Sequence, residues 1–422
     1  MSDMTLLGAQ AKQAARILAR ADTSQKNAAL RALAEGLTRR LDDILTANAR
    51  DIEYATAKGV APYFIDRLTL NEKRLRLIAG DVLKVAELPD PVGEPFDAVT
   101  LPNGLRLHKR RIPLGVLGVI YESRPNVTID IAALAIKSGN ACILRGGSET
   151  IHSNRALVGV AHEALVANGL PREAVSFVDD TDRARIMELL RLTDYVDLII
   201  PRGGAALHDL CRKNSTIPVI TGGMGINHIY VDETADQDMA LDILFNAKVQ
   251  KPTVCNALGT VIVHRDIAEA FIPKMAGRLG EAGVSFRCDP RACDIFSRHV
   301  PNADFQPAAP PDWDTEWLSL VAGVKVVDSL DDAIAFIEAH SMDHSDGIVS
   351  RNPDHIARFV NEVDSCGVFV NASTRFNDGG QFGLGAEVAI STQRIHARGP
   401  MGLRELTSYK WVVEGDGHVR PG

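Results

Sequence analysis

Several common sequence signals are missing from this chain of 422 residues. Its six cysteines form no Cys-x-x-Cys pair and no histidines stand at zinc-ligand spacing, so no metal site is predicted. No uncharged apolar run approaches the roughly 18 residues that a membrane helix requires. The first residues lack a basic region followed by an apolar run, so we expect no signal peptide. Free thiols then fit a reducing, cytoplasmic location.

An excess of positive charge is also missing. The formal net charge is −8, which argues against nucleic acid or an anionic membrane as the main partner. The chain is longer than one hydrophobic core normally supports, so two or three domains are expected.

The first part of the chain predicts helices and then a hairpin. Ser24 is a candidate N-cap for a helix whose leucines recur three and four residues apart, from Leu30 to Leu45. Asn103-Gly104, between two alternating runs, is a strong hairpin signal. A basic hairpin outside any strand–helix rhythm is typical of an arm, and we expect it to reach another subunit.

From residue 116 onward, apolar runs alternate with helical stretches. The first set of predicted strands comprises 116–120, 141–144, 175–178, 196–200 and 218–220. A second set, beginning near 227, comprises 228–231, 260–264, 324–327, 346–349 and 367–370. Continuous apolar strands separated by helices predict an α/β fold with buried parallel sheets covered on both faces. Residues 300–313 are predicted to be a surface loop, and 410–413 a final strand.

Two strand ends suggest nucleotide binding. The runs Arg145-Gly146-Gly147-Ser148 and Arg202-Gly203-Gly204 each combine an arginine with glycines, so a guanidinium and backbone amides can meet phosphate. The usual Gly-x-Gly-x-x-Gly fingerprint is absent from the first strand–helix turn, and Gly-Gly turns also occur as plain loops.

The stretch from Asn246 to Thr260 contains the most informative cysteine. Lys248 and Lys251 place positive charge near Cys255, which favours a thiolate. Pro252 precedes the cysteine and predicts a turn there, and Asn256 could donate to an oxyanion. From spacing alone, Cys255 is either a catalytic nucleophile or a small buried hydrophobe.

Blocks along nearly the whole chain resemble the γ-glutamyl phosphate reductases (glutamate-5-semialdehyde dehydrogenases) of the aldehyde dehydrogenase superfamily. The blocks are Tyr121-Glu-Ser-Arg-Pro-Asn-Val-Thr, Leu144-Arg-Gly-Gly-Ser-Glu, residues 246–256, Asn371-Ala-Ser-Thr-Arg-Phe, Phe382-Gly-Leu-Gly-Ala-Glu and the run that begins at His396. The resemblance implies that Cys255 is the nucleophile.

The same resemblance implies an architecture and its partners. It implies an NADPH-binding Rossmann-type domain (1–92 and 112–225), an α/β catalytic domain (226–375), and an oligomerisation arm with a C-terminal tail (93–111 and 376–422). The implied reaction reduces L-glutamyl 5-phosphate with NADPH in proline biosynthesis. A homo-oligomer, and functional coupling to glutamate kinase, are implied as well.

Roles for individual residues also follow from the resemblance. The Cys255 backbone amide with Asn126 or Asn256 would hold the oxyanion. The substrate would contact the following residues: Arg124, Lys251, Ser373 and Arg375. The cofactor would contact Arg145, Gly146, Gly147, Ser148, Arg202, Gly203, Gly204, Gly222 and Glu316. Because residue 148 is not acidic, the site has room for a 2′-phosphate.

Two rival functions remain. Hydrolytic aldehyde dehydrogenases carry a general-base Glu where this chain has Ile220, in Ile220-Thr221-Gly222-Gly223. That difference argues against a hydrolytic enzyme and for phosphate-dependent chemistry. The other rival is a binding subunit without catalytic activity, which an intact Cys255 motif argues against.

Overall fold

The computed structural model describes residues 3–420, except for the side chains of residues 62 and 63. Its chain divides into two compact units. Unit 1 comprises residues 1–221, 383–389 and 401–422, and unit 2 comprises residues 222–382 and 390–400. Each unit contains a parallel sheet, which confirms the predicted α/β fold.

Unit 1 is built on a four-stranded parallel sheet with the order β5-β4-β3-β6. Strands β3 and β4 are buried along their whole length, as expected for a sheet covered on both faces. The strands are β3 (Val116–Tyr121), β4 (Ala141–Arg145), β5 (Val175–Phe177) and β6 (Leu198–Arg202). The helices are α1 (Asp3–Leu18), α2 (Thr23–Arg39), α3 (Leu41–Ala57), α4 (Pro62–Leu68), α5 (Glu72–Glu87), α6 (Asn126–Lys137), α7 (Ile151–Ala167), α8 (Ala184–Leu189) and α9 (Ala205–Asn214).

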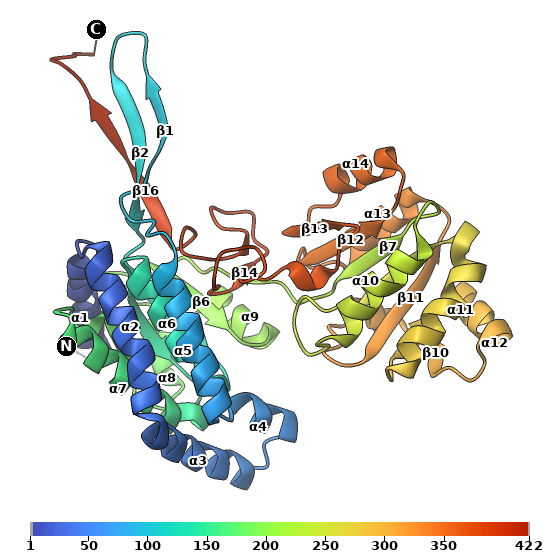
Figure 1. The fold of residues 1–422 in the computed structure, drawn as a ribbon, viewed down its shortest axis with the longest axis horizontal. Helices are drawn as coiled ribbons and strands as arrows, with labels where there is room; N and C mark the ends of the chain where they lie inside the picture. Colours follow the sequence, from blue (N-terminus) through green and yellow to red (C-terminus); the bar gives the residue numbers. More distant parts are fainter. Residues whose placement is uncertain (1–2, 421–422) are drawn as a thin grey trace. The chain divides into compact units, whose positions relative to one another are not determined.

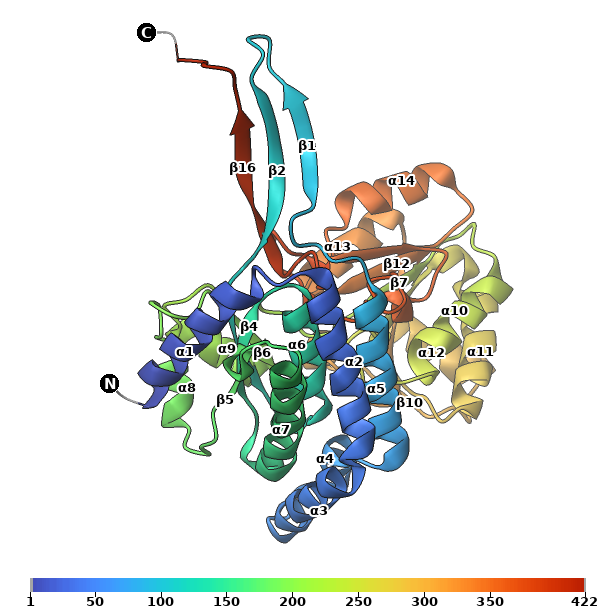
Figure 2. The same cartoon turned by 60° about the vertical axis from the view of Figure 1, so that its left-hand side comes forward.

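A three-stranded antiparallel arm also belongs to unit 1 (Figures 1 and 2). It comprises β1 (Pro95–Thr100), β2 (Arg106–Pro113) and β16 (Thr407–Glu414), with β2 in the middle. The predicted hairpin and final strand are therefore confirmed. On one face of the arm, the Lys109 ammonium lies over the rings of Phe96, Tyr409 and Trp411.

Unit 2 is built on a seven-stranded parallel sheet with the order β10-β9-β11-β8-β7-β12-β13. Its strands are β7 (His228–Val231), β8 (Thr260–His264), β9 (Ser285–Cys288), β10 (Phe305–Pro307), β11 (Val321–Val327), β12 (Ser345–Val349) and β13 (Gly367–Val370). Its helices are α10 (Gln237–Val249), α11 (Arg265–Glu281), α12 (Pro290–His299), α13 (Leu330–His340) and α14 (Pro353–Glu362). A small antiparallel pair, β14 (Ile390–Ser391) and β15 (Gly399–Pro400), completes the unit.

Four local predictions need correction. Residues 218–220 are not a strand, because only an isolated parallel bridge pairs Val219 with Ile199. The single helix predicted from Leu30 to Leu45 is two helices, α2 and α3, which meet at Arg40. The N-cap of α2 is Asp22, whose carboxylate accepts the Gln25 N–H, and Ser24 lies inside the helix. Residues 300–313 are not only a loop, because they include strand β10 at the edge of the sheet. That strand is three residues long and mostly exposed, so it has no apolar pattern that would reveal it.

No helix among the described residues is both long enough and apolar enough to cross a bilayer.

Candidate active site

Cys255 lies on a turn between α10 and β8, as its sequence context predicts. The Ala257 N–H donates to the Val254 carbonyl and closes this turn. The Cys255 residue is partly exposed, whereas the following residues enter the buried strand β8. The thiol thus lies at the amino-terminal end of a strand in the middle of the sheet.

The backbone around Cys255 is held by Asn227, a fully buried residue just before β7. Its Nδ2 donates to the carbonyls of Cys255 and Ala257, at 2.7 Å each. Its own carbonyl accepts the N–H groups of Gly259 and Thr260. These four hydrogen bonds therefore fix the position of the turn that carries the Cys255 sulfur.

A second clamp joins this turn to the segment 371–377. The Thr374 hydroxyl donates to the Asn256 carbonyl at 2.8 Å. The Asn256 Nδ2 donates to the Asn377 carbonyl at 3.0 Å, and its Oδ1 accepts from the Arg375 guanidinium. The structure therefore brings Cys255, Asn256, Ser373 and Arg375 together. The Asn256 amide is engaged in holding the loop, and its oxyanion role stays a prediction.

The Arg375 guanidinium interacts electrostatically with the Cys255 thiol. Burial lowers the pKa of the guanidinium from its ordinary value, while Asp378 and Cys255 act to raise it. Because that coupling is mutual, the guanidinium favours the thiolate form of Cys255. Arg375 is itself oriented by Gln250, whose side-chain oxygen accepts its Nε–H at 3.1 Å.

The two lysines that sequence reasoning placed beside Cys255 differ from one another. Lys251 is exposed. Lys248 is 1% exposed, and its Nζ donates to the Leu258 carbonyl at 2.8 Å. Burial lowers the pKa of Lys248 to about 7. Lys248 therefore braces the strand that leaves the cysteine turn, and near neutral pH it carries only part of a charge.

Glu316 lies close to the same loop. Its Oε1 accepts the Gly225 N–H at 2.9 Å, and a side chain at Gly225 would collide with the Cys255 carbonyl. Gly222, the first residue of unit 2, packs its Cα against the Ile390 carbonyl and has no room for a Cβ. Both residues occupy unit 2 with Cys255, and their contacts to a cofactor stay predictions.

The other predicted cofactor residues lie in unit 1, where β4 and β6 end. Side chains at Gly146 and Gly147 would collide with Asn154 and Glu149, so these two buried positions have room only for glycine. The Arg145 guanidinium is buried and donates to the carbonyls of Gly146 and Thr181, at 2.8 and 3.2 Å. Ser148, by contrast, is exposed.

The turn after β6 is also built of glycine, and α9 begins beyond it. The Gly204 N–H donates to the Glu122 carboxylate at 3.1 Å, and that same carboxylate fills the space that a Cβ at Gly203 would need. Glu122 thus lies at the helix N-terminus where sequence reasoning expects phosphate. A phosphate that binds there must displace this carboxylate or share the amides with it.

Asn126 begins α6, directly after the loop that follows β3. Its Nδ2 donates to Asp130 at 3.0 Å. Burial raises the pKa of Asp130 to about 6, although Asn126 and Arg202 both act to lower it. The structure therefore groups Asn126, Asp130 and Arg202 at the carboxyl ends of β3 and β6. Arg124, in the preceding loop, is exposed.

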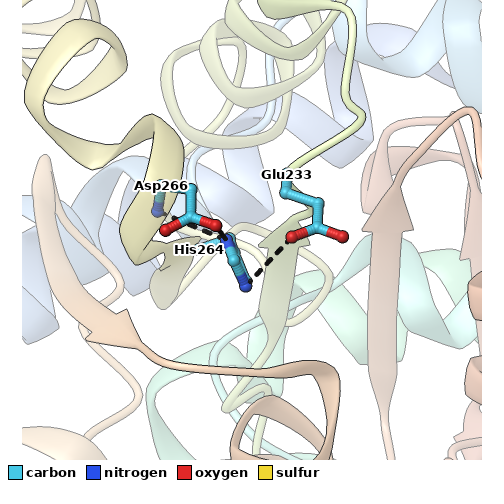
Figure 3. Close-up of side chains that lie close together, drawn as sticks. All are labelled: Glu233, His264 and Asp266. Atoms are coloured by element: carbon cyan, nitrogen blue, oxygen red, sulfur yellow. Dashed lines mark hydrogen bonds and ion pairs between the residues drawn. The ribbon is translucent and has the colours of Figure 1, made fainter.

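A separate polar cluster in unit 2 comprises Glu233, His264 and Asp266, drawn in Figure 3. His264 caps α11, and its Nδ1 accepts the Asp266 N–H at 3.3 Å. Its Nε2 faces Glu233 Oε2 at 3.4 Å. Both ring nitrogens of His264 therefore contact polar groups of the chain.

Known proteins resemble this chain from end to end. A model described as the aldehyde dehydrogenase family matches residues 2–292.

The chain belongs to the aldehyde dehydrogenase family.

Within the family it matches the γ-glutamyl phosphate reductases. That of Chloroflexus aggregans is 54% identical over 422 residues, and that of Roseiflexus castenholzii is 54% identical over 423, with 100% of each chain covered. The crystal structure of γ-glutamyl phosphate reductase from Thermotoga maritima superposes with a TM-score of 0.96 at 44% identity, again with full coverage of both chains. The chain is thus an oxidoreductase of this family, whose members use NAD or NADP.

Sequence reasoning missed Asn227, Thr374 and Gln250, which hold the cysteine loop and its arginine in this member of the family. Asn227 precedes a strand and is 28 residues from Cys255 in sequence, so its position carries no local signal. Thr374 lies in the block Asn371-Ala-Ser-Thr-Arg-Phe, which resembles the family. The block does not reveal that the Thr374 hydroxyl donates to the Asn256 carbonyl.

Proposed function

We propose that this chain reduces L-glutamyl 5-phosphate to L-glutamate 5-semialdehyde and phosphate, with NADPH as hydride donor, in the second step of proline biosynthesis. The observation that carries the proposal is a partly exposed Cys255 on a clamped turn, coupled to the Arg375 guanidinium. Sequence similarity to γ-glutamyl phosphate reductases over the full length of the chain supports the proposal. The six cysteines are all thiols, which supports a cytoplasmic location.

The thiolate begins the reaction. Cys255 Sγ attacks the acyl carbon of the substrate, the bond from that carbon to the phosphate oxygen breaks, and phosphate leaves. Arg375 stabilises the thiolate before the attack. Phosphate departs toward Arg124, while Lys251 and Ser373 bind the rest of the substrate. The Cys255 backbone N–H and Asn126 donate to the oxyanion, since the Asn256 amide already serves the 371–377 segment.

A nicotinamide cofactor, when bound, would supply the hydride for the thioester; the aldehyde is then released and Cys255 returns to the thiolate. The strand ends of unit 1 are proposed to hold its phosphates because glycines follow β4 and β6, and Gly203 and Gly204 are exposed at the start of α9. Arg145, Arg202, Gly204 and Gly222 complete the proposed contacts, with Glu316 at the nicotinamide ribose. The neutral Ser148 leaves room for the 2′-phosphate, which is the reason to propose NADPH over NADH.

The chain has no general base to activate water at the position where hydrolytic relatives carry one. Ile220 occupies it and is 1% exposed. A positioned base contributes typically about 10²–10⁴-fold, so the thioester should hydrolyse slowly and react with phosphate instead. Because an acyl phosphate is labile, we also propose functional coupling to glutamate kinase.

The test runs the reaction backwards. NADPH formation is followed from glutamate 5-semialdehyde and NADP in phosphate-free buffer, then after adding phosphate or arsenate. We expect turnover only after the addition. Ile220→Glu should introduce some phosphate-independent oxidation, with Ile220→Gln as the matched control. A fast steady state in phosphate-free buffer, with glutamate as product, would support the hydrolytic alternative.

A further inference from the structure

Unit 1 contains a cavity at the base of the arm whose charges are not balanced. Its volume is about 470 Å³, within the range of small-molecule sites. Helix α1, the end of β2 and the start of β3 form its walls, with Lys410 contributed by β16. The cations on its walls are Lys12, Arg16, Arg110, Arg111 and Lys410, and Asp197 is the single acid.

That acid and its neighbour Glu94 are already engaged. Asp197 Oδ2 accepts the Val116 N–H at 2.8 Å, and Oδ1 lies 3.5 Å from the Lys12 ammonium. Glu94 pairs with Arg111 through one oxygen and with Arg404 through the other. Among the described residues, therefore, no carboxylate forms an ion pair with Arg16, Arg110 or Lys410.

Two of these cations are also direct cross-strand neighbours. Arg110 on β2 is opposite Lys410 on β16, and like charges in that position destabilise a sheet. The Arg110 guanidinium lies against Gly93, which has a φ of 87° and no side chain to separate them. An arrangement that is unfavourable for the empty protein becomes favourable when an anion binds between the two cations.

The cavity is distinct from the proposed cofactor site. It lies at Gly115 and Val116, where β3 begins, and Asp197 directly precedes β6. The turns that carry Gly146 and Gly203 follow the opposite, carboxyl ends of the neighbouring strands β4 and β6. At about 3.3 Å per residue, strands of five or six residues separate the two edges by roughly 17 Å.

We propose that this cavity binds a small organic oxyanion with two or more negative charges, held by Arg16, Arg110 and Lys410. The shared chemistry is that of a phosphate or carboxylate group. Apolar side chains of Ala15, Ala19, Val92 and Leu114 line the remaining wall and accommodate the body of the ligand. The site is independent of the reaction at Cys255.

Calorimetric titration of the full chain tests the proposal, with pyrophosphate and citrate as separate probes at constant ionic strength. The two probes distinguish a phosphate from a carboxylate ligand. We expect one saturable site per chain whose affinity falls at least about tenfold in Arg110→Gln and in Lys410→Gln. Arg375→Gln should leave this binding unchanged, which separates it from probe binding at the active site.

Arg106→Gln is the matched control. Arg106 lies on β2 and is paired with Glu414, and it does not line the cavity. No saturable binding of either probe, or an equal loss in Arg106→Gln, would overturn the proposal. Arg110→Gln should also melt no lower than wild type without a probe, because it removes a repulsion. If Arg110→Gln instead dissociates an oligomer and no probe binds, the cavity is a subunit contact and the proposal is wrong.

Discussion

At the scale of single residues, the partly exposed thiol of Cys255 differs from the thiols of the three buried cysteines. Burial raises the pKa of Cys142, Cys211 and Cys288, so those thiols are inert at neutral pH. Cys255→Ser should lower turnover by several orders of magnitude, because a hydroxyl without an adjacent base is a poor nucleophile. Its melting temperature should match wild type. Cys366→Ser is the control, and comparable losses in both variants would contradict the assignment.

Asn227 should act on catalysis by positioning the nucleophile. Asn227→Leu keeps the branched shape of the side chain but removes both donors to the carbonyls of Cys255 and Ala257. We expect kcat to fall by about 10²-fold, since misplacement near 1 Å can cost that much. KM for NADP should stay unchanged. Alkylation of Cys255 by iodoacetamide gives an independent measure, and an unaltered rate would argue against the positioning role.

Lys248 should make stability depend on pH. Its pKa in the folded chain is lowered to about 7, so between pH 7 and about 10 the folded state binds fewer protons than the unfolded state. Stability should therefore rise with pH across that window, by at most about 1.4 kcal/mol per pH unit. Denaturation midpoints from pH 7 to 9 measure this. Lys248→Met should flatten the rise of stability with pH, and Lys251→Met, at an exposed position, should not. If stability depends on pH in the same way in wild type and both variants, the prediction is wrong.

At the scale of elements, the turn between β4 and α7 should select the cofactor. Ser148 is exposed there, beside a backbone of glycines. Ser148→Glu should reduce the preference for NADPH over NADH at least about tenfold, through repulsion of the 2′-phosphate. Ser148→Gln matches its size without the charge and should change little. The measurement is the ratio of kcat/KM with NADPH to kcat/KM with NADH. Equal use of both cofactors by wild type and variant would show that the adenosine ribose lies elsewhere.

At the scale of the whole molecule, the arm should mediate assembly. Tyr409, Trp411 and Val413 are about half exposed on one face of β16. A three-stranded arm with such a face gains stability by covering it. Deletion after Thr407 should give monomers or aggregates, measured by sedimentation. Trp411→Glu should weaken assembly, and Glu414→Gln should not. An intact chain that sediments as a monomer would exclude an oligomerisation arm.

The sequence alone determined those parts of the molecule that depend on local pattern. The strands from β3 to β8 follow continuous apolar runs, and the turn at Cys255 follows from Pro252 and its neighbours. The short polar strand β10 had no such pattern. The choice of Asp22 over Ser24 as a helix cap also escaped prediction, because both residue types suit that position.

Only the tertiary structure decided how the nucleophile is supported. Arg375 is 120 residues from Cys255 in sequence, so no local spacing relates them. The sequence predicts Lys248 as a positive charge beside the thiol. In the folded chain its ammonium is buried and donates to the Leu258 carbonyl. The pairing of Arg110 with Lys410 depends on the register of two strands nearly 300 residues apart. Sequence motifs identify the candidate functional side chains. Long-range packing decides which of these side chains come into contact, and burial decides which of them lose their charge.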